Sequence, residues 1–245
     1  MPADHSLTRT IRYAAGDTGV IDVWYPRSEP VGITVALVHG GFWKAEWDGH
    51  HLEPLAAALA RTGFDVASLE YPRVGMPGGG WPGTVASVLA GLNAVADDTA
   101  LPDSLVAVGH SAGGHLVTLA GSSSLDETFG VTGIVALAGV VDLALAAAMG
   151  LGGGAVRAFM DDADEASWAA ADPARLRLTV PTVLLTGNVD EDVPHIVSES
   201  YLSSRTPDDA ACELRLLLGV GHMDLVDPSH PAYAELLRAV RDLAQ

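Results

Sequence analysis

The chain has 245 residues, of which 49% are apolar and 18% are charged, and its formal net charge is −18. This length and apolar content predict one globular domain over residues 1–245 and exclude a disordered chain. The negative charge, which no basic cluster reverses locally, argues against nucleic acid and anionic lipid as partners.

Short apolar runs bounded by turn residues predict strands, and stretches of helical period between them predict helices. In chain order the expected strands are 20–25, 33–38, 64–69, 105–108, 133–137, 180–185 and 212–217, and the expected helices are 55–61, 85–96, 112–120, 196–203 and 233–243. The alternation predicts an α/β fold with a mainly parallel sheet covered by helices on both faces. Because the first run precedes any convincing helix, we expect it to pair antiparallel at one edge.

Three segments depart from this pattern. Residues 71–83, YPRVGMPGGGWPG, hold too many glycines and prolines for regular structure and predict a loop over one end of the sheet. Residues 143–160 begin alanine-rich and then pass through four glycines, which fits either a small cap or lid or a plain surface connection. The acidic run at 161–165 lacks the glycine and glutamate spacing of a calcium loop and predicts a solvated helix start.

The strongest chemical signal is the sequence Gly109-His110-Ser111-Ala112-Gly113, which directly follows an apolar strand and directly precedes a helix. At such a turn the nucleophile adopts strained backbone angles, and glycines are needed on both sides because a Cβ would collide with neighbouring backbone. The turn exposes the Ser111 oxygen and directs the helix N-terminus toward the forming oxyanion. Ser111 is therefore the predicted nucleophile.

A serine needs a base, which in this architecture follows the last strand. His222 fits, since it lies after the strand ELRLLL and before the final helix. His115 lies on the helix below the nucleophile and is expected to pack there, and His110 is fixed inside the turn. Surface roles are expected for the histidines in loops or at helix ends, which are His5, His50, His51, His195 and His230.

The acid that orients the base is expected in the loop after a late strand. Asp190 follows the strand VPTVLLTG and is the favoured residue, with Glu191 and Asp192 as near competitors. Asp142 is a weaker substitute, and Asp224 lies too close to His222 along the chain to brace its ring. The order serine, acid, histidine is that of the α/β hydrolases.

The early strand that ends at Val38 continues into the sequence HGGFW, residues 39–43. Adjacent glycines let backbone amides approach a substrate, so the amides of Gly41 or Phe42 are expected to form an oxyanion hole with Ala112. An ordinary glycine turn is the alternative. His39 is expected to hold this loop by hydrogen bonding.

Three tryptophans, Trp43, Trp47 and Trp81, fall in or near loops expected above the sheet. They favour an apolar or aromatic substrate group, although such rings can equally pack the loops themselves. No residue pattern requires a metal or an organic cofactor.

The segments HGGFW, GHSAGG, GNVDEDVP and GHMDLVDP together resemble the α/β hydrolase superfamily, and more narrowly its small esterases and kynurenine formamidase-like proteins that carry HGGxW. The resemblance runs from about residue 20 to the final helix. It implies hydrolysis of a carboxylic ester or an aryl formamide through an acyl-enzyme. Acyl transfer, intramolecular cyclisation and a catalytically silent ligand-binding protein are the alternatives.

The opening residues MPADHSLTRT contain no apolar core of signal-peptide length, and no run approaches the roughly 20 apolar residues of a spanning helix. The one cysteine, Cys212, excludes an intrachain disulfide. We therefore expect a cytoplasmic protein with a small-molecule substrate and no membrane partner. Monomer and homodimer both remain open.

Overall fold

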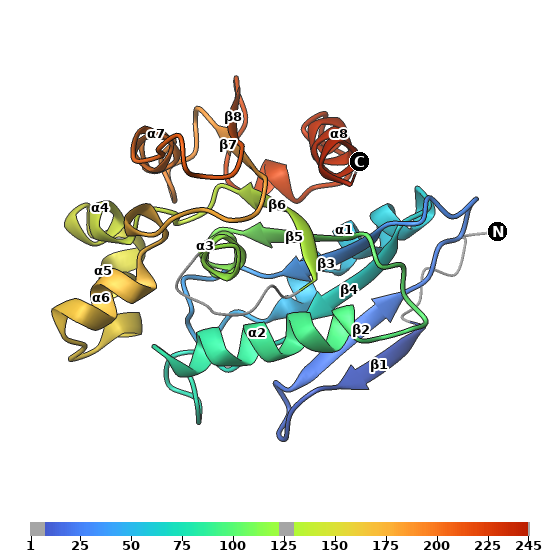
Figure 1. Cartoon of the computed structure of the whole chain (residues 1–245), viewed down its shortest axis with the longest axis horizontal. Coiled ribbons are helices and arrows are strands. Elements are labelled where there is room, and N and C mark those ends of the chain that lie inside the picture. Colours follow the sequence, from blue (N-terminus) through green and yellow to red (C-terminus); the bar gives the residue numbers. More distant parts are fainter. Residues whose placement is uncertain (1–7, 123–129, 245) are drawn as a thin grey trace.

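The computed structural model describes residues 8–122 and 130–244 (Figure 1). His5 and most of the opening segment considered for a signal peptide lie outside these ranges. The described residues form eight strands: β1 (Arg9–Arg12), β2 (Val20–Trp24), β3 (Thr34–Val38), β4 (Asp65–Leu69), β5 (Leu105–His110), β6 (Val131–Leu137), β7 (Thr182–Gly187) and β8 (Cys212–Leu217).

These strands make one sheet in the order β1-β2-β4-β3-β5-β6-β7-β8. From β4 to β8 every neighbouring pair is parallel, whereas β2 pairs antiparallel with both β1 and β4. A parallel sheet brings the carboxyl ends of its strands to one edge, where ligands bind in open α/β sheets. The loops that follow β3, β5, β7 and β8 carry the candidate site residues and therefore converge there.

Helices cover both faces of the sheet (Figure 1). One face carries α1 (Glu53–Arg61) and α8 (Tyr233–Leu243), and the other carries α2 (Gly83–Ala96), α3 (Ala112–Ala120) and α7 (Ile196–Ser203). Three further helices, α4 (Leu143–Ala148), α5 (Leu151–Met160) and α6 (Glu165–Ala171), gather together beside α3. This is the α/β hydrolase fold that the sequence predicted.

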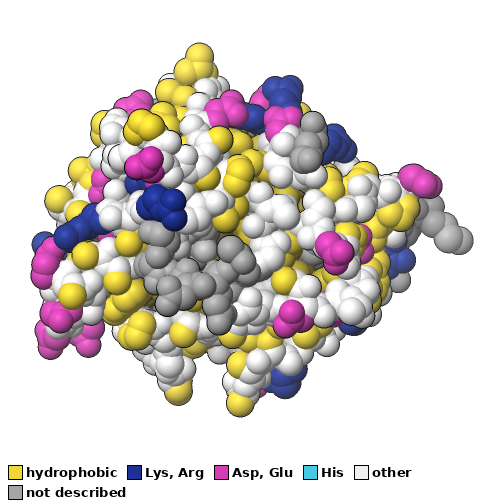
Figure 2. Space-filling view, viewed as in Figure 1, with side chains coloured by type: hydrophobic (Ala, Val, Ile, Leu, Met, Phe, Trp, Pro, Cys, Tyr) yellow, Lys and Arg dark blue, Asp and Glu magenta, His cyan; other side chains and the backbone are white. Residues whose placement is uncertain are grey.

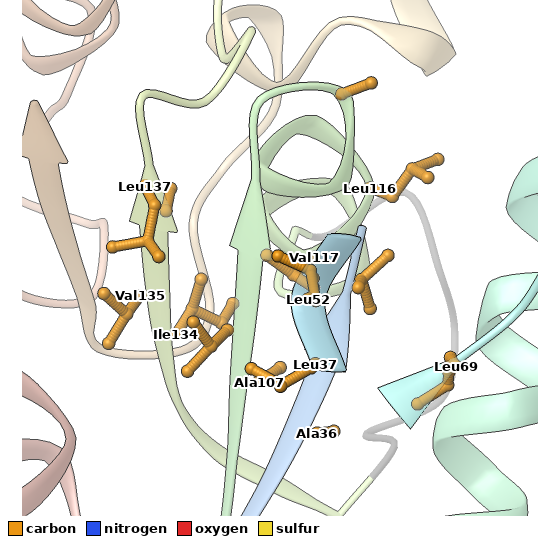
Figure 3. Packing of buried hydrophobic residues seen from close by; sticks show 14 of the residues in the cluster. Ala36, Leu37, Leu52, Leu69, Ala107, Leu116, Val117, Ile134, Val135 and Leu137 are labelled. Carbon is orange, nitrogen blue, oxygen red and sulfur yellow. The ribbon is translucent and has the colours of Figure 1, made fainter. Parts of the chain in front are cut away.

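The core lies between the central strands and these helices. Every residue of β3, β4 and β5 is buried, because both faces of these strands are covered. Figure 3 shows side chains of β3, β5 and β6 in one cluster with Leu116 and Val117 of α3. This packing fixes the start of α3 against the ends of the central strands.

For the run at 20–25, the structure confirms the expected pairing and corrects the expected position in the sheet. The run at 20–25 pairs antiparallel as expected, but it is not the edge strand, because β1 lies outside it with Arg9 opposite Val23. The segment RTIR carries no strand signal, since it is short and only one of its four residues is apolar.

The irregular loop expected at 71–83 is confirmed, as no strand or helix forms before α2 begins at Gly83.

The segment 143–160 forms α4 and α5 and includes left-handed glycines at 150 and 152–154. A Cβ on Gly152 would lie 2.6 Å from the ring of Phe42, so this segment rests directly on the loop that follows β3. Mobility of the segment as a lid stays a prediction. The acidic run that follows does start a helix, because Asp164 accepts the amide of Ser167 in the first turn of α6 at 2.9 Å.

Exposed carboxylates stand at several separate places on the face shown in Figure 2, including a group at the left over the turn between α5 and α6. Within residues 8–122 and 130–244, no helix combines the length and apolar character needed to cross a membrane.

Candidate active site

Ser111 lies in the tight turn between β5 and α3, with φ 55° and ψ −118°. A Cβ on Gly109 would overlap the carbonyl of Gly113, and a Cβ on Gly113 would overlap the carbonyl of Val38. Both glycines are therefore required by close backbone contacts, as the motif predicted. The amide of Ser111 donates to the carbonyl of Leu137 at 2.8 Å, which ties the turn to β6.

His222 and Asp190 meet although they are far apart in the sequence. His222 follows β8, Asp190 follows β7, and Nδ1 of His222 lies 2.7 Å from Oδ2 of Asp190. The other oxygen of Asp190 accepts the amides of Asp192 at 2.9 Å and Val193 at 2.8 Å. The Asp190 side chain is fully buried, so both oxygens act in a medium where hydrogen bonds to charge are strong. This arrangement leaves Nε2 of His222 available as a base.

Ser111 and His222 line one cavity of about 210 Å³. Its other walls come from the loop after β3, the loop before α1, the turn at Ser111 and the loops after β7 and β8; these residues are Gly41, Phe42, Trp47, His51, His110, Asp192 and Met223. The nucleophile and base candidates therefore face the same small space, which is lined mostly by apolar groups.

The loop after β3 passes directly against the nucleophile. A Cβ on Gly40 would lie 2.9 Å from Cβ of Ser111. Gly41 and Phe42 have left-handed φ values of 105° and 50°, and within the described residues their amides donate no hydrogen bond. Ala112 opens α3, where first-turn amides have no partner inside the helix. Three free amides thus lie on two loops that meet at Ser111.

A network that the sequence did not predict holds this loop. Glu70, at the end of β4, accepts the amides of Gly49 and Tyr71 at 3.0 Å and pairs with Arg73. Its carboxylate lies 3.1 Å from Nε2 of His39, whose ring stacks on Tyr71 at 4.2 Å. The Tyr71 hydroxyl donates to the carbonyl of His39 at 2.7 Å. His39 therefore holds the loop as expected, through partners directly after β4 that no local pattern indicated.

The electrostatics of Glu70 match its position in this network. Burial by itself would raise the pKa of the carboxyl, but the hydrogen bond with His39, the nearby charges and the Gly49 amide lower it to about 2. Glu70 is therefore a carboxylate at neutral pH and stays available to its donors.

His110 supports the loop that carries the base. Its Nε2–H donates to the carbonyl of His222 at 3.2 Å, and the two rings lie 4.4 Å apart. Burial, followed by the nearby His222 and His51, lowers the pKa of His110 well below its ordinary value. The ring is thus neutral. The motif identified His110 only as a residue of the turn.

The remaining candidates from the sequence have other partners. His115 is buried and bonds the carbonyl of Ala171 at 2.8 Å, and burial lowers its pKa to about 4, so it packs below the nucleophile as expected. Asp142 caps α4 and accepts from Ser200 at 2.6 Å. Asp224 accepts the amide of Gly221 at 2.7 Å. The carboxylate that bonds the base ring is that of Asp190.

The three tryptophans separate in the structure. Trp47 lines the cavity and is 52% exposed. Trp43 is fully buried and stacks on Phe159 at 4.6 Å, and Trp81 packs against the core and donates its amide to the carbonyl of Phe159. Of the three candidate substrate-binding residues, Trp47 therefore lines the cavity, whereas the alternative of internal packing applies to Trp43 and Trp81.

Ligand atoms of Asp190, Asp192 and His222 lie within 4.8 Å of one another, which is a spacing that a metal ion could use. Both oxygens of Asp190 and Nδ1 of His222 already have hydrogen-bond partners at 2.7–2.9 Å. The hydrogen bonds account for this cluster, and the donor set does not call for a metal.

Residues 21–204, most of the chain, match the model of the BD-FAE family. The chain belongs to the BD-FAE family. No curated protein matches the sequence. Among solved structures, a truncated carbohydrate esterase from gut microbiota is similar over 99% of both chains, with a TM-score of 0.79 and 18% identity.

Two further solved structures share the fold of this BD-FAE protein. Esterase B from Lactobacillus rhamnosis, solved with a tributyrin phosphonate inhibitor, has a TM-score of 0.78 and 20% identity over 96% of this chain and 85% of its own. Esterase 2 from Thermogutta terrifontis, solved after phosphonylation by sarin, has a TM-score of 0.74 and 17% identity over 97% and 92%. At these identities the likeness establishes the α/β hydrolase fold.

Proposed function

We propose that this protein is a serine esterase that cleaves a small carboxylic ester through an acyl-enzyme. Ser111 is the nucleophile, His222 the general base and Asp190 the acid that orients it. The observation that carries the proposal is the shared cavity, which is lined both by a serine on a strained turn and by a histidine whose Nδ1 is bonded to a buried carboxylate.

The reaction follows from these contacts. His222 Nε2 removes the Ser111 proton as the oxygen attacks the ester carbonyl, and Asp190 stabilises the imidazolium that forms. The amides of Gly41, Phe42 and Ala112 hold the negative oxygen of the tetrahedral intermediate. The imidazolium then returns its proton to the leaving alcohol. Water, activated by the same base, attacks the acyl group and releases the acid.

The cavity walls support an apolar or aromatic group on the substrate. Phe42, Trp47 and Met223 contribute large apolar surfaces around Ser111, and Asp192 at the rim disfavours a substrate with a carboxylate of its own. The solved esterases that react with phosphonate and sarin share the fold, and this is a further reason to test the same chemistry here.

A fluorophosphonate probe tests the assignment of the nucleophile. We expect the protein to be labelled, Ser111→Ala to lose labelling completely, and Ser203→Ala, which alters an exposed helical serine, to label at the original rate. An unlabelled but folded protein would favour a ligand-binding role over catalysis. Labelling that persists in Ser111→Ala would place the nucleophile elsewhere.

Product analysis distinguishes the acyl bonds that such a site could cleave. p-Nitrophenyl esters of increasing acyl length should be hydrolysed, with N-formylkynurenine run beside them. A higher kcat/KM for the formamide than for every ester would make the protein an arylformamidase instead. Transfer of the acyl group to an added alcohol, in preference to water, would identify an acyltransferase.

A further inference from the structure

His51 is a cavity residue that the proposed mechanism does not use. It lies in the short 3-10 helix Gly49–Leu52 that precedes α1, and it lines the same cavity as Ser111 and His222. The surrounding loop is well anchored, because Glu70 accepts the Gly49 amide at 3.0 Å and Asp48 accepts the amide of His50 at 3.1 Å. The backbone that carries the His51 side chain is therefore fixed at the wall of the cavity.

The hydrogen bond of Nδ1 fixes the tautomer of His51. Nδ1 lies 2.7 Å from the carbonyl oxygen of Asp48, which can only accept, so Nδ1 carries the proton. Burial lowers the pKa of His51, which keeps the ring neutral at physiological pH. In the neutral ring Nε2 then carries a lone pair. Across residues 8–122 and 130–244 no donor is bonded to Nε2.

The groups around Nε2 of His51 determine which ligands its lone pair favours. Apart from the rings of His110 and His222, the large side chains on the wall are Phe42, Trp47 and Met223, which are mainly apolar, and the carboxylate of Asp192 at the rim is also an acceptor. Nε2 of His51 thus offers a fixed hydrogen-bond acceptor in a largely apolar space. A substrate that fills the cavity displaces water from this acceptor, so a ligand that supplies a donor is favoured over one that leaves Nε2 unpaired.

We propose that His51 determines specificity by accepting a hydrogen bond at Nε2 from a hydroxyl group of the substrate. This inference rests on the esterase function proposed above and adds the class of substrate: a neutral ester with an apolar part and a free hydroxyl on its acyl or its alcohol side. His51 takes no proton in the reaction. Its contribution is to the binding of one group.

Two pairs of nearly isosteric esters test the proposal. On the alcohol side, 2-hydroxyethyl butyrate is compared with propyl butyrate, and on the acyl side methyl 3-(4-hydroxyphenyl)propanoate is compared with methyl 3-(4-methylphenyl)propanoate. We expect kcat/KM to favour the hydroxyl member of one pair by about five- to tenfold, as one net hydrogen bond provides. The pair that shows the preference identifies the side that carries the hydroxyl.

Variants then assign the preference to His51. His51→Phe removes the acceptor and should bring the ratio of the two kcat/KM values close to one, whereas His51→Gln, which retains an acceptor, should keep part of the preference. His50→Phe changes the adjacent, largely exposed histidine and should leave the ratio as in the original protein. Thermal melting of each variant shows that it is folded.

The outcomes separate the two proposals. If phosphonate labelling and p-nitrophenyl acetate hydrolysis both fail in the folded protein, the esterase function is wrong. If both succeed but neither ester pair shows a preference, or the preference survives in His51→Phe, the role of His51 is wrong and the esterase function stands.

Discussion

Replacement of Asp190 by asparagine tests the orientation of the base. The asparagine side chain would carry one acceptor oxygen where the aspartate uses two, so it must choose between two orientations. If the NH₂ group faced the loop, the amides of Asp192 and Val193 would lose their acceptor. Leaving buried donors unpaired costs about 1–3 kcal/mol each. The oxygen will therefore remain with the two amides.

In the favoured orientation the asparagine NH₂ group faces Nδ1 of His222, which lies 2.7 Å from the replaced oxygen. Two donors cannot face each other, so Nδ1 becomes the acceptor and the ring proton moves to Nε2. Nε2, the nitrogen assigned as the base, then already carries a proton and cannot take that of Ser111. The same change in other serine hydrolases lowers kcat by about 10⁴-fold, which corresponds to about 5.4 kcal/mol at 1.36 kcal/mol for each tenfold step.

We expect Asp190→Asn to lower kcat for p-nitrophenyl butyrate by a factor of about 10³ to 10⁴ at neutral pH, with a small change in KM. The unfolding midpoint in urea should change little, because the loop keeps its two hydrogen bonds. Glu191→Gln, which alters the exposed neighbour, is the matched control and should retain activity within about twofold. A kcat for Asp190→Asn within tenfold of the original value, in folded protein, would refute this reasoning.

Three further predictions concern the support of the site. Gly113→Ala should lower the free energy of unfolding by about 3 kcal/mol in urea titration and reduce phosphonate labelling, since its Cβ overlaps backbone of β3; unchanged labelling would contradict the close approach. Trp43→Ala should cost about 3–5 kcal/mol of stability, whereas Trp47→Ala should cost less than about 1 kcal/mol and raise KM; equal losses would contradict their different burial. Because the folded pKa of Glu70 is about 2, below its ordinary 4.5, its carboxylate stabilises the fold above pH 4.5 and this contribution declines as the pH falls toward 2. Glu70→Gln should therefore be less stable than the original protein at pH 7, and the difference in urea midpoint should shrink as the pH falls from 4.5 toward 2; a constant difference would show that the ionised form is not what stabilises the loop.

The sequence by itself determined the features that depend on local geometry. Strand and helix periods were sufficient for the central sheet, and the expected bounds of α3, α7, α8 and β8 agree with the structure. The turn at Ser111 was readable because steric contacts between near neighbours demand its glycines. The role of Asp190 could also be predicted from local sequence, since one of its oxygens accepts the amides of the residues two and three positions later in the chain.

Tertiary structure decided everything that depends on which side chains meet across the sheet. Trp43 and Trp47 lie four residues apart, and only packing against Phe159 made one a core residue and the other a cavity wall. β1 exists because β2 offers it a hydrogen-bonding edge, not because its own residues favour a strand. Glu70 and His51 became part of the site through contacts that close long loops, and such contacts leave no period or motif in the chain.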